Sequence, residues 1–232
     1  MKYFLVLLFF PFSVNAQIEP SNDKIEYQAR RDSVLLETAF GSIYLTHDTS
    51  AISYEYLNPS HIDSTVFTDF YREMQLELEG KFSIQTNHFN HPFINSHWTN
   101  LYQFNNAFCL YGPSDWMSHT ELFFTDSLLY NLRSDGDLEF IMSVSTISSN
   151  ACEFELLNYW NEPYFLAIRI VDENRGIATF EWFDEKHVSL HKTLYVKSEM
   201  VRKFPILIFD CGKQKCAFGD VNFFEPIEFS DY

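Results

Sequence analysis

Residues 164–171 (YFLAIRIV), 172–176 (DENRG) and 177–183 (IATFEWF) decide the fold of this chain. The two outer segments are rich in β-branched and aromatic residues and the middle one in turn residues, so together they predict an antiparallel hairpin. We expect Val171 to pair with Ile177. That register places six apolar side chains on one face of the hairpin: Leu166, Ile168, Ile170, Ala178, Phe180 and Trp182.

Segments of the same kind precede and follow this hairpin at short intervals. Asp135-Gly136, a tight-turn sequence, lies between two of them. Many short strands separated by turns predict a mainly β (β-rich α+β) fold, built as an antiparallel barrel or sandwich. We expect the further strands at residues 42–46, 51–57, 101–110, 119–124, 127–132, 138–147, 152–157, 188–196, 205–210 and 217–224.

Residues 63–80 are predicted to form one amphipathic helix that packs on the barrel or sandwich. Apolar side chains recur there at steps of three and four residues, whereas Asp69, Glu73 and Glu77 occupy the opposite face. The apolar face consists of Val66, Phe67, Phe70, Tyr71, Met74 and Leu78.

The first sixteen residues have the layout of a secretory signal peptide. Lys2 precedes an apolar run at residues 3–10, and Val14-Asn15-Ala16 resembles a signal-peptidase site. We therefore expect a signal peptide at 1–16, a flexible arm at 17–23 and a single β-rich domain at 24–232. The mature chain is expected in the periplasm or outside the cell, with no membrane span.

The chain has four cysteines, and an even number in an exported protein predicts disulfides. Cys211 and Cys216 are separated by four residues between two apolar runs, a spacing that suits a bridge at the base of a hairpin. That pairing leaves Cys109 to pair with Cys152. Four cysteines allow three connectivities, so this arrangement is one of three.

The composition limits the classes of partner. With 25 Phe and 13 Tyr, the chain is expected to have an aromatic core. The formal net charge of −16 repels nucleic acid and anionic lipid. A basic protein, a cation or a neutral ligand suits such a surface better.

The most polar cluster of the sequence contains His88, His91 and His97. Three imidazoles within ten residues suit a metal such as zinc if a loop brings them together, or they contact a ligand directly. Trp116, in a predicted turn, is a further candidate for ligand contact. No catalytic motif, cofactor motif or recognised metal-site spacing is found in the sequence.

We therefore expect an exported, disulfide-containing β-rich domain that is not an enzyme and that binds a ligand or a protein. Two alternatives remain open. One is a metal-dependent hydrolase that uses the loop of His88, His91 and His97, and the other is an acidic inhibitor of a basic partner protein.

Overall fold

The computed structural model describes residues 33–38, 41–48, 57, 64–82, 87–104, 107–112, 121–132, 137–210 and 229. Several predictions from the sequence concern residues outside this part. They are the signal peptide, the flexible arm, the strand expected at 51–57 apart from Leu57, the turn at Asp135-Gly136, Trp116, the bridge between Cys211 and Cys216, and the strand expected at 217–224.

The predicted hairpin forms with the predicted faces. Strand β9 (Pro163–Asp172) pairs with β10 (Ile177–Phe183), and Ile168 lies opposite Phe180. The first pair differs, because a register shift next to Ile177 places that residue opposite Asp172 and not opposite Val171. Asp172 is therefore the last residue of β9, and its carboxylate accepts a 2.6 Å bond from the Arg175 guanidinium in the turn that follows.

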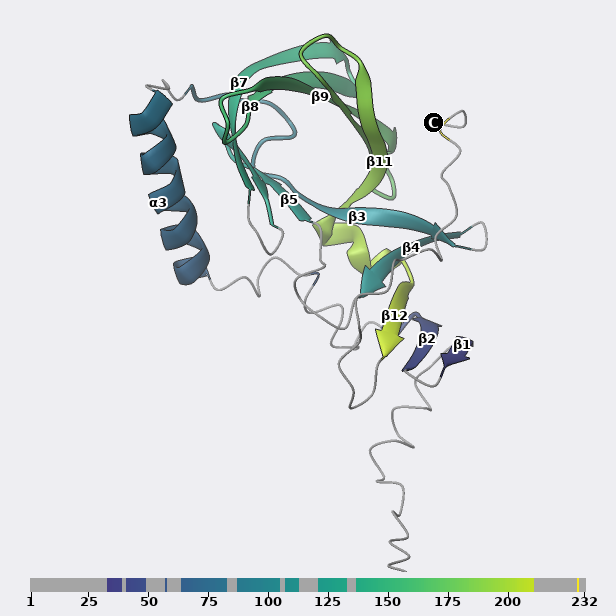
Figure 1. Cartoon of the computed structure of the whole chain (residues 1–232). Coiled ribbons are helices and arrows are strands. Elements are labelled where there is room, and N and C mark those ends of the chain that lie inside the picture. Colours follow the sequence, from purple (N-terminus) through teal and green to yellow (C-terminus); the bar gives the residue numbers. More distant parts are fainter. Residues whose placement is uncertain are drawn as a thin grey trace, which may run out of the picture. The chain divides into compact units, whose positions relative to one another are not determined.

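Eight strands close into an antiparallel barrel (Figure 1). Strands β5 to β11 pair in sequence order, and β3 pairs with both β5 and β11, which closes the ring. The sequence left a barrel and a sandwich open, and the fold is a barrel. The strands not yet introduced are β3 (His97–Phe104), β5 (Glu121–Phe124), β6 (Leu128–Asn131), β7 (Asp137–Ser148), β8 (Ala151–Leu157) and β11 (Ser189–Lys197).

A second set of strands continues from the far half of β3. Strand β4 (Ala107–Gly112) pairs with β3, and then come β12 (Ile206–Asp210), β2 (Gly41–Thr46) and β1 (Ser33–Thr38). The single strand predicted at 101–110 is wrong, because two strands share this range. Asn105 and Asn106 are residues that favour turns, and in the sequence they separate the residues of the two strands.

Aromatic side chains fill the barrel. Trp98, Phe124, Phe154 and Phe180 are fully buried, and the rings of Trp98 and Phe180 lie 5.2 Å apart, edge to face. These residues come from four different strands. Their contacts therefore hold opposite sides of the barrel together.

The outer face of the barrel carries two further clusters. Leu194 and Val196 of β11 pack with Ile206 of β12 and with Val201 of the short helix η3 (Ser198–Lys203). The second cluster joins helix α3 to strands β6 and β7. Both clusters explain why strand residues that point away from the barrel interior are nevertheless apolar.

Helix α3 (Ser64–Phe82) confirms the predicted amphipathic helix and extends two residues further (Figure 1). Tyr71 and Leu78 are buried against Leu138 and Phe140 of β7. The predicted polar face, Asp69, Glu73 and Glu77, is exposed. The helix thus covers a strip of the barrel wall.

Replacing Leu78 is expected to destabilise the fold far more than replacing Leu76. Leu78 is fully buried in the contact between α3 and the barrel, whereas Leu76 is 60% exposed. Leu78→Ala should lower the free energy of unfolding by about 2–4 kcal/mol, and Leu76→Ala should change it by less than about 0.5 kcal/mol. Urea denaturation measures both; equal losses would contradict the packing of α3.

The predicted bridge between Cys109 and Cys152 is not formed. Cys152 is a free cysteine on β8, buried inside the barrel. Cys109 lies on β4 and packs with Leu207 in a separate, smaller cluster. A disulfide needs two cysteines that face each other with Cα atoms within about 7 Å, whereas these two pack in different clusters. Burial raises the pKa of the Cys152 thiol to about 12.

Two titratable side chains lie where the barrel closes, Glu121 buried on β5 and His97 half-buried on β3. Glu121 of β5 is 3% exposed, and its Oε1 atom has no hydrogen-bond partner in the described part of the chain. Burial raises its pKa from 4.5 to about 7. Burial of His97, whose ring meets Phe123 edge to face at 4.8 Å, lowers the pKa of its imidazole from 6.5 to about 4. In both groups, burial favours the neutral form over the charged one.

Glu121→Gln is expected to change how stability depends on pH. Glu121 makes its full contribution to the free energy of unfolding below pH 4.5, and this contribution is lost as the pH rises through 7. That of His97 is full above pH 6.5 and is lost as the pH falls to 4. The two slopes oppose each other between pH 4.5 and 6.5.

In Glu121→Gln, the free energy of unfolding should increase by up to about 1.4 kcal/mol per pH unit as the pH rises from 4.5 to 6.5. At pH 8 the variant should exceed the wild type by on the order of 2–3 kcal/mol. Urea denaturation at several pH values measures this. A variant whose stability follows that of the wild type at every pH would contradict the burial of an uncompensated carboxyl.

Candidate functional site

A cavity of about 480 Å³ lies at one end of the barrel. The turns between β7 and β8 and between β9 and β10 border it, together with the end of β11 and the segment 90–93 that precedes β3. This size is within the range of small-molecule sites. Its lining consists of Asn90, His91, Pro92, Phe93, Thr146, Ser148, Ser149, Asn150, Ala151, Ile170, Glu173, Gly176 and Lys197.

Asn150 fixes the turn between β7 and β8 on one side of the cavity. Its carbonyl accepts a 2.8 Å bond from the Ile170 amide, and its side-chain amide donates to the Ile170 carbonyl at 3.3 Å. The Ser148 hydroxyl donates to Asn150 Oδ1 at 2.7 Å. The polar rim at this turn is therefore tied to β9.

Gly176 brings Lys197 close to the turn between β9 and β10. The Lys197 amide donates to the Gly176 carbonyl at 3.0 Å. Gly176 has a φ of 69°, and a Cβ added there would lie 3.0 Å from Met200 and 3.4 Å from the Cβ of Lys197. Glycine suits this position because a side chain would be strained by the backbone angle and would press on Met200.

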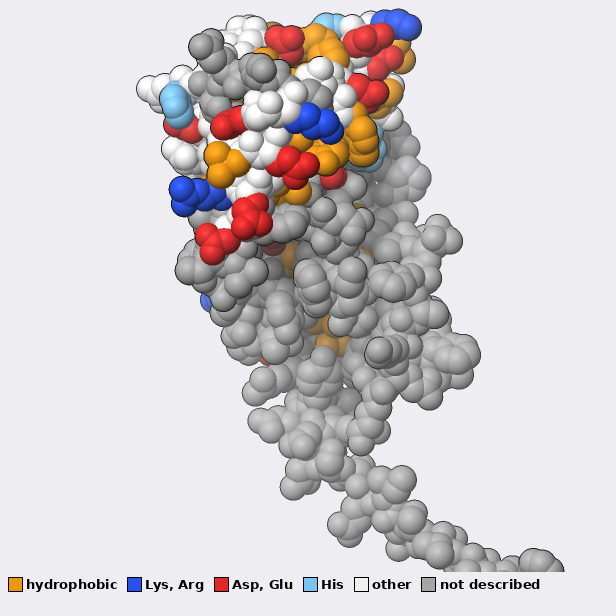
Figure 2. Space-filling view, turned by 60° about the vertical axis from the view of Figure 1, so that its left-hand side comes forward, with side chains coloured by type: hydrophobic (Ala, Val, Ile, Leu, Met, Phe, Trp, Pro, Cys, Tyr) orange, Lys and Arg blue, Asp and Glu red, His pale blue; other side chains and the backbone are white. Residues whose placement is uncertain are grey.

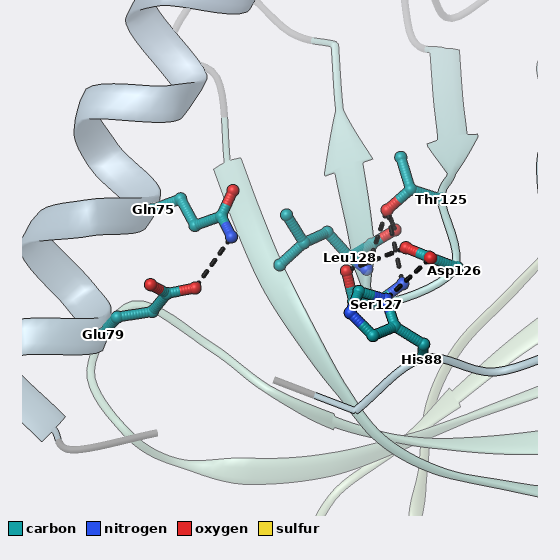
Figure 3. Close-up of polar contacts among 7 residues, drawn as sticks. All are labelled: Gln75, Glu79, His88, Thr125, Asp126, Ser127 and Leu128. Atoms are coloured by element: carbon teal, nitrogen blue, oxygen red, sulfur yellow. Dashed lines mark hydrogen bonds and ion pairs between the residues drawn. The ribbon is translucent and has the colours of Figure 1, made fainter. Parts of the chain in front are cut away.

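The segment before β3 closes the end of the barrel. The Phe89 amide donates to the Asp126 carbonyl at 2.7 Å, and His88 Nδ1 lies 2.7 Å from Asp126 Oδ2 (Figure 3). Further along, Phe93 is buried with its ring centre 5.8 Å from that of Trp98. We call residues 87–96 the plug segment.

Ser96 holds the buried end of the plug segment. Its hydroxyl donates to the Phe93 carbonyl and accepts a 2.7 Å bond from Trp98 Nε1. The Ile94 amide donates to the His91 carbonyl at 2.8 Å, which makes a turn between these residues. Phe93 is thereby fixed as part of the cavity floor.

His91 lies between the cavity and the aromatic core. Its ring is nearly parallel to that of Phe93, with centres 5.5 Å apart, and it meets Phe154 edge to face at 6.0 Å. Burial lowers the pKa of the imidazole below 6.5, so the ring is neutral at pH 7. Its Nδ1 atom accepts a long bond from the Phe93 amide, which assigns the proton to Nε2.

The three histidines of the predicted cluster are not brought together. His88 pairs with Asp126, His97 packs on Phe123, and His91 lines the cavity. Within the described ranges, no group of three or more His, Cys, Asp or Glu side chains is arranged to hold a metal ion. The site that a metal-dependent hydrolase of this loop requires is therefore not assembled among these residues.

The contacts of His88 also differ from those of a serine catalytic triad. Asp126 binds His88 through Oδ2, and the Ser127 hydroxyl donates to Asp126 Oδ1 at 3.1 Å (Figure 3). In a triad the serine bonds to the imidazole and not to the carboxylate. Here Asp126 holds the plug segment to the turn between β5 and β6. The other contact in the figure, Gln75 to Glu79, lies along α3.

Lys197, Glu173 and Thr146 line the cavity but were not predicted from the sequence. In an up-and-down barrel, alternate turns meet at the same end, so residues near 149, 174 and 197 are neighbours once the strand order is known. The strand order would therefore have identified these three residues as neighbours. No local motif marks these residues.

No protein-family model, curated protein sequence or solved structure matches this chain. Among the helices that the structure describes, none combines the length and the apolar character needed to cross a membrane.

Proposed function

We propose that this chain is a non-enzymatic binding module that takes a small molecule in the cavity at the plugged end of the barrel. The observation that carries this proposal is the cavity itself, whose floor includes Phe93 and Ile170 and whose rim is polar. Such a combination of apolar and polar lining is typical of ligand pockets. Export to the periplasm or beyond, expected from residues 1–16, is part of the proposal.

The rigidity of the surroundings supports binding without large rearrangement. Both turns at the rim and the plug segment are held by backbone hydrogen bonds. The interior beneath is filled with aromatic rings, so a ligand at this end does not need to enter the barrel centre. A preformed site of this kind loses little conformational entropy on binding.

Thr146→Trp is expected to abolish ligand binding, and Ser145→Trp to leave it intact. Both residues are exposed, but Thr146 lines the cavity and its neighbour Ser145 does not. An indole at position 146 fills part of the space, and the same indole at position 145 points to the other face of β7. The two variants therefore differ only in the face that carries the added ring.

Native mass spectrometry of the chain purified from its own host compartment measures this difference. The expected result is a small-molecule adduct on the wild type and on Ser145→Trp, but not on Thr146→Trp. A wild type without an adduct, or equal adducts on both variants, would contradict binding in this cavity.

Trp160 favours a second candidate function, binding of a basic protein. It is 70% exposed on a turn whose backbone is held by Asn158, whose Oδ1 accepts bonds from the Trp160 and Glu162 amides. Acidic side chains are spread over the face seen in Figure 2, in keeping with the net charge of −16. Exposed tryptophan on a fixed turn is a frequent interface anchor.

A basic partner should bind with steep salt dependence and should lose most of its affinity in Trp160→Ala. Affinity measurements at 50 and 300 mM salt with the wild type and the variant test both points. A partner whose affinity is the same at both salt concentrations and in the variant excludes this function.

A further inference from the structure

The charges that line the cavity indicate the class of its ligand. Of the thirteen lining residues, only Glu173 and Lys197 carry a charge at neutral pH, because His91 is neutral there. Their signs are opposite. The cavity therefore has no net charge, although the chain as a whole has a formal charge of −16.

Neither of these charges is neutralised within the described part of the chain. Glu173 and Lys197 form no ion pair there, either with each other or with a third residue. Charged neighbours do pair, since Arg175 binds Asp172 in the same turn and Lys192 lies 3.5 Å from Glu181. Other charged residues of the described part also have no ion pair there, but Glu173 and Lys197 are the two that line the cavity.

The backbone fixes these two residues on either side of Gly176. The Glu173 carbonyl accepts a 3.2 Å bond from the Gly176 amide, and the Gly176 carbonyl accepts a 3.0 Å bond from the Lys197 amide. The stem of Lys197 packs against Gly176, with Cγ 3.6 Å from the place of a Cβ. The carboxylate and the ammonium are thus attached close together at one edge of the cavity.

We infer that the cavity binds a small zwitterion of the amino-acid or dipeptide class, and this inference rests on the proposed function. The carboxylate of the ligand pairs with Lys197 and its ammonium with Glu173. Its side chain lies on Phe93 and the ring of His91, which are stacked on each other. A ligand with one charge forms a charge-assisted hydrogen bond with only one of the two protein groups and leaves the other without a partner from the ligand.

The overall charge of the chain strengthens this choice. The formal net charge of −16 on the chain disfavours the approach of an anion. A cation is attracted, but inside the cavity it meets the ammonium of Lys197. A molecule with no net charge and two opposite groups avoids both penalties.

Three ligands that share one phenethyl skeleton test the inference on the full mature chain. They are free phenylalanine, phenethylamine, which lacks the carboxylate, and 3-phenylpropionate, which lacks the ammonium. Isothermal titration calorimetry should show that phenylalanine binds at least about 10-fold more tightly than either analogue, because a hydrogen bond between charged groups is lost in each.

Two variants identify the partner of each charge. Lys197→Met should weaken the binding of phenylalanine about 10-fold and leave that of phenethylamine unchanged or stronger. Glu173→Gln should weaken phenylalanine similarly and spare 3-phenylpropionate. Lys186→Met and Glu185→Gln remove the same charges at exposed positions of the turn at the other end of β10, and both should bind phenylalanine as the wild type does.

The outcomes separate this inference from the proposed function. Equal binding of all three ligands, or the loss of phenylalanine binding in the control variants, overturns the inference. So does the absence of phenylalanine binding in a protein whose native adduct disappears in Thr146→Trp, and in that case the proposed function stands. If the Thr146→Trp comparison shows no effect on the adduct, the proposed function itself fails.

Discussion

The closure of the barrel at Trp98 is the constraint on which the rest of the structure depends. Trp98 lies on β3 opposite Leu122 of β5 on one side and Lys197 of β11 on the other. Its ring is fully buried against Phe93 and Phe180. One residue therefore joins the first and last strands of the ring, the aromatic interior and the plug segment. The cavity forms where these parts meet.

The parts of the fold that the sequence predicted are those governed by local pattern. The hairpin of β9 and β10 has a period of two and a polar turn, so its faces could be assigned from residue types alone. The spacing of Tyr71, Met74 and Leu78 predicted α3 for the same reason. The closure of the barrel could not be predicted from local sequence pattern. It depends on pairs such as Val196 with Thr99, which are nearly one hundred residues apart.

The candidate site differs from the one expected from the sequence. Of the three histidines in the predicted cluster, only His91 lines the cavity, whereas His88 pairs with Asp126 and His97 packs on Phe123. The predicted bridge from Cys109 to Cys152 is not formed, because an even number of cysteines carries no information about which cluster of the fold each one enters. Lys197 ends β11 and Glu173 lies in the turn after β9, and only the strand order places both at the same cavity.

Because Cys152 is buried, the rate of its chemical modification measures how often the barrel opens. The thiolate is the form that alkylating and oxidising reagents attack, and with a pKa of about 12 it is scarcely populated at neutral pH. Its sulfur also has no exposed surface, so a reagent reaches it only after β8 leaves its neighbours. The rate at which Cys152 is modified therefore reports how often the wall of the barrel opens. In an oxidising compartment, the same burial delays scrambling with the other cysteines until the barrel has opened.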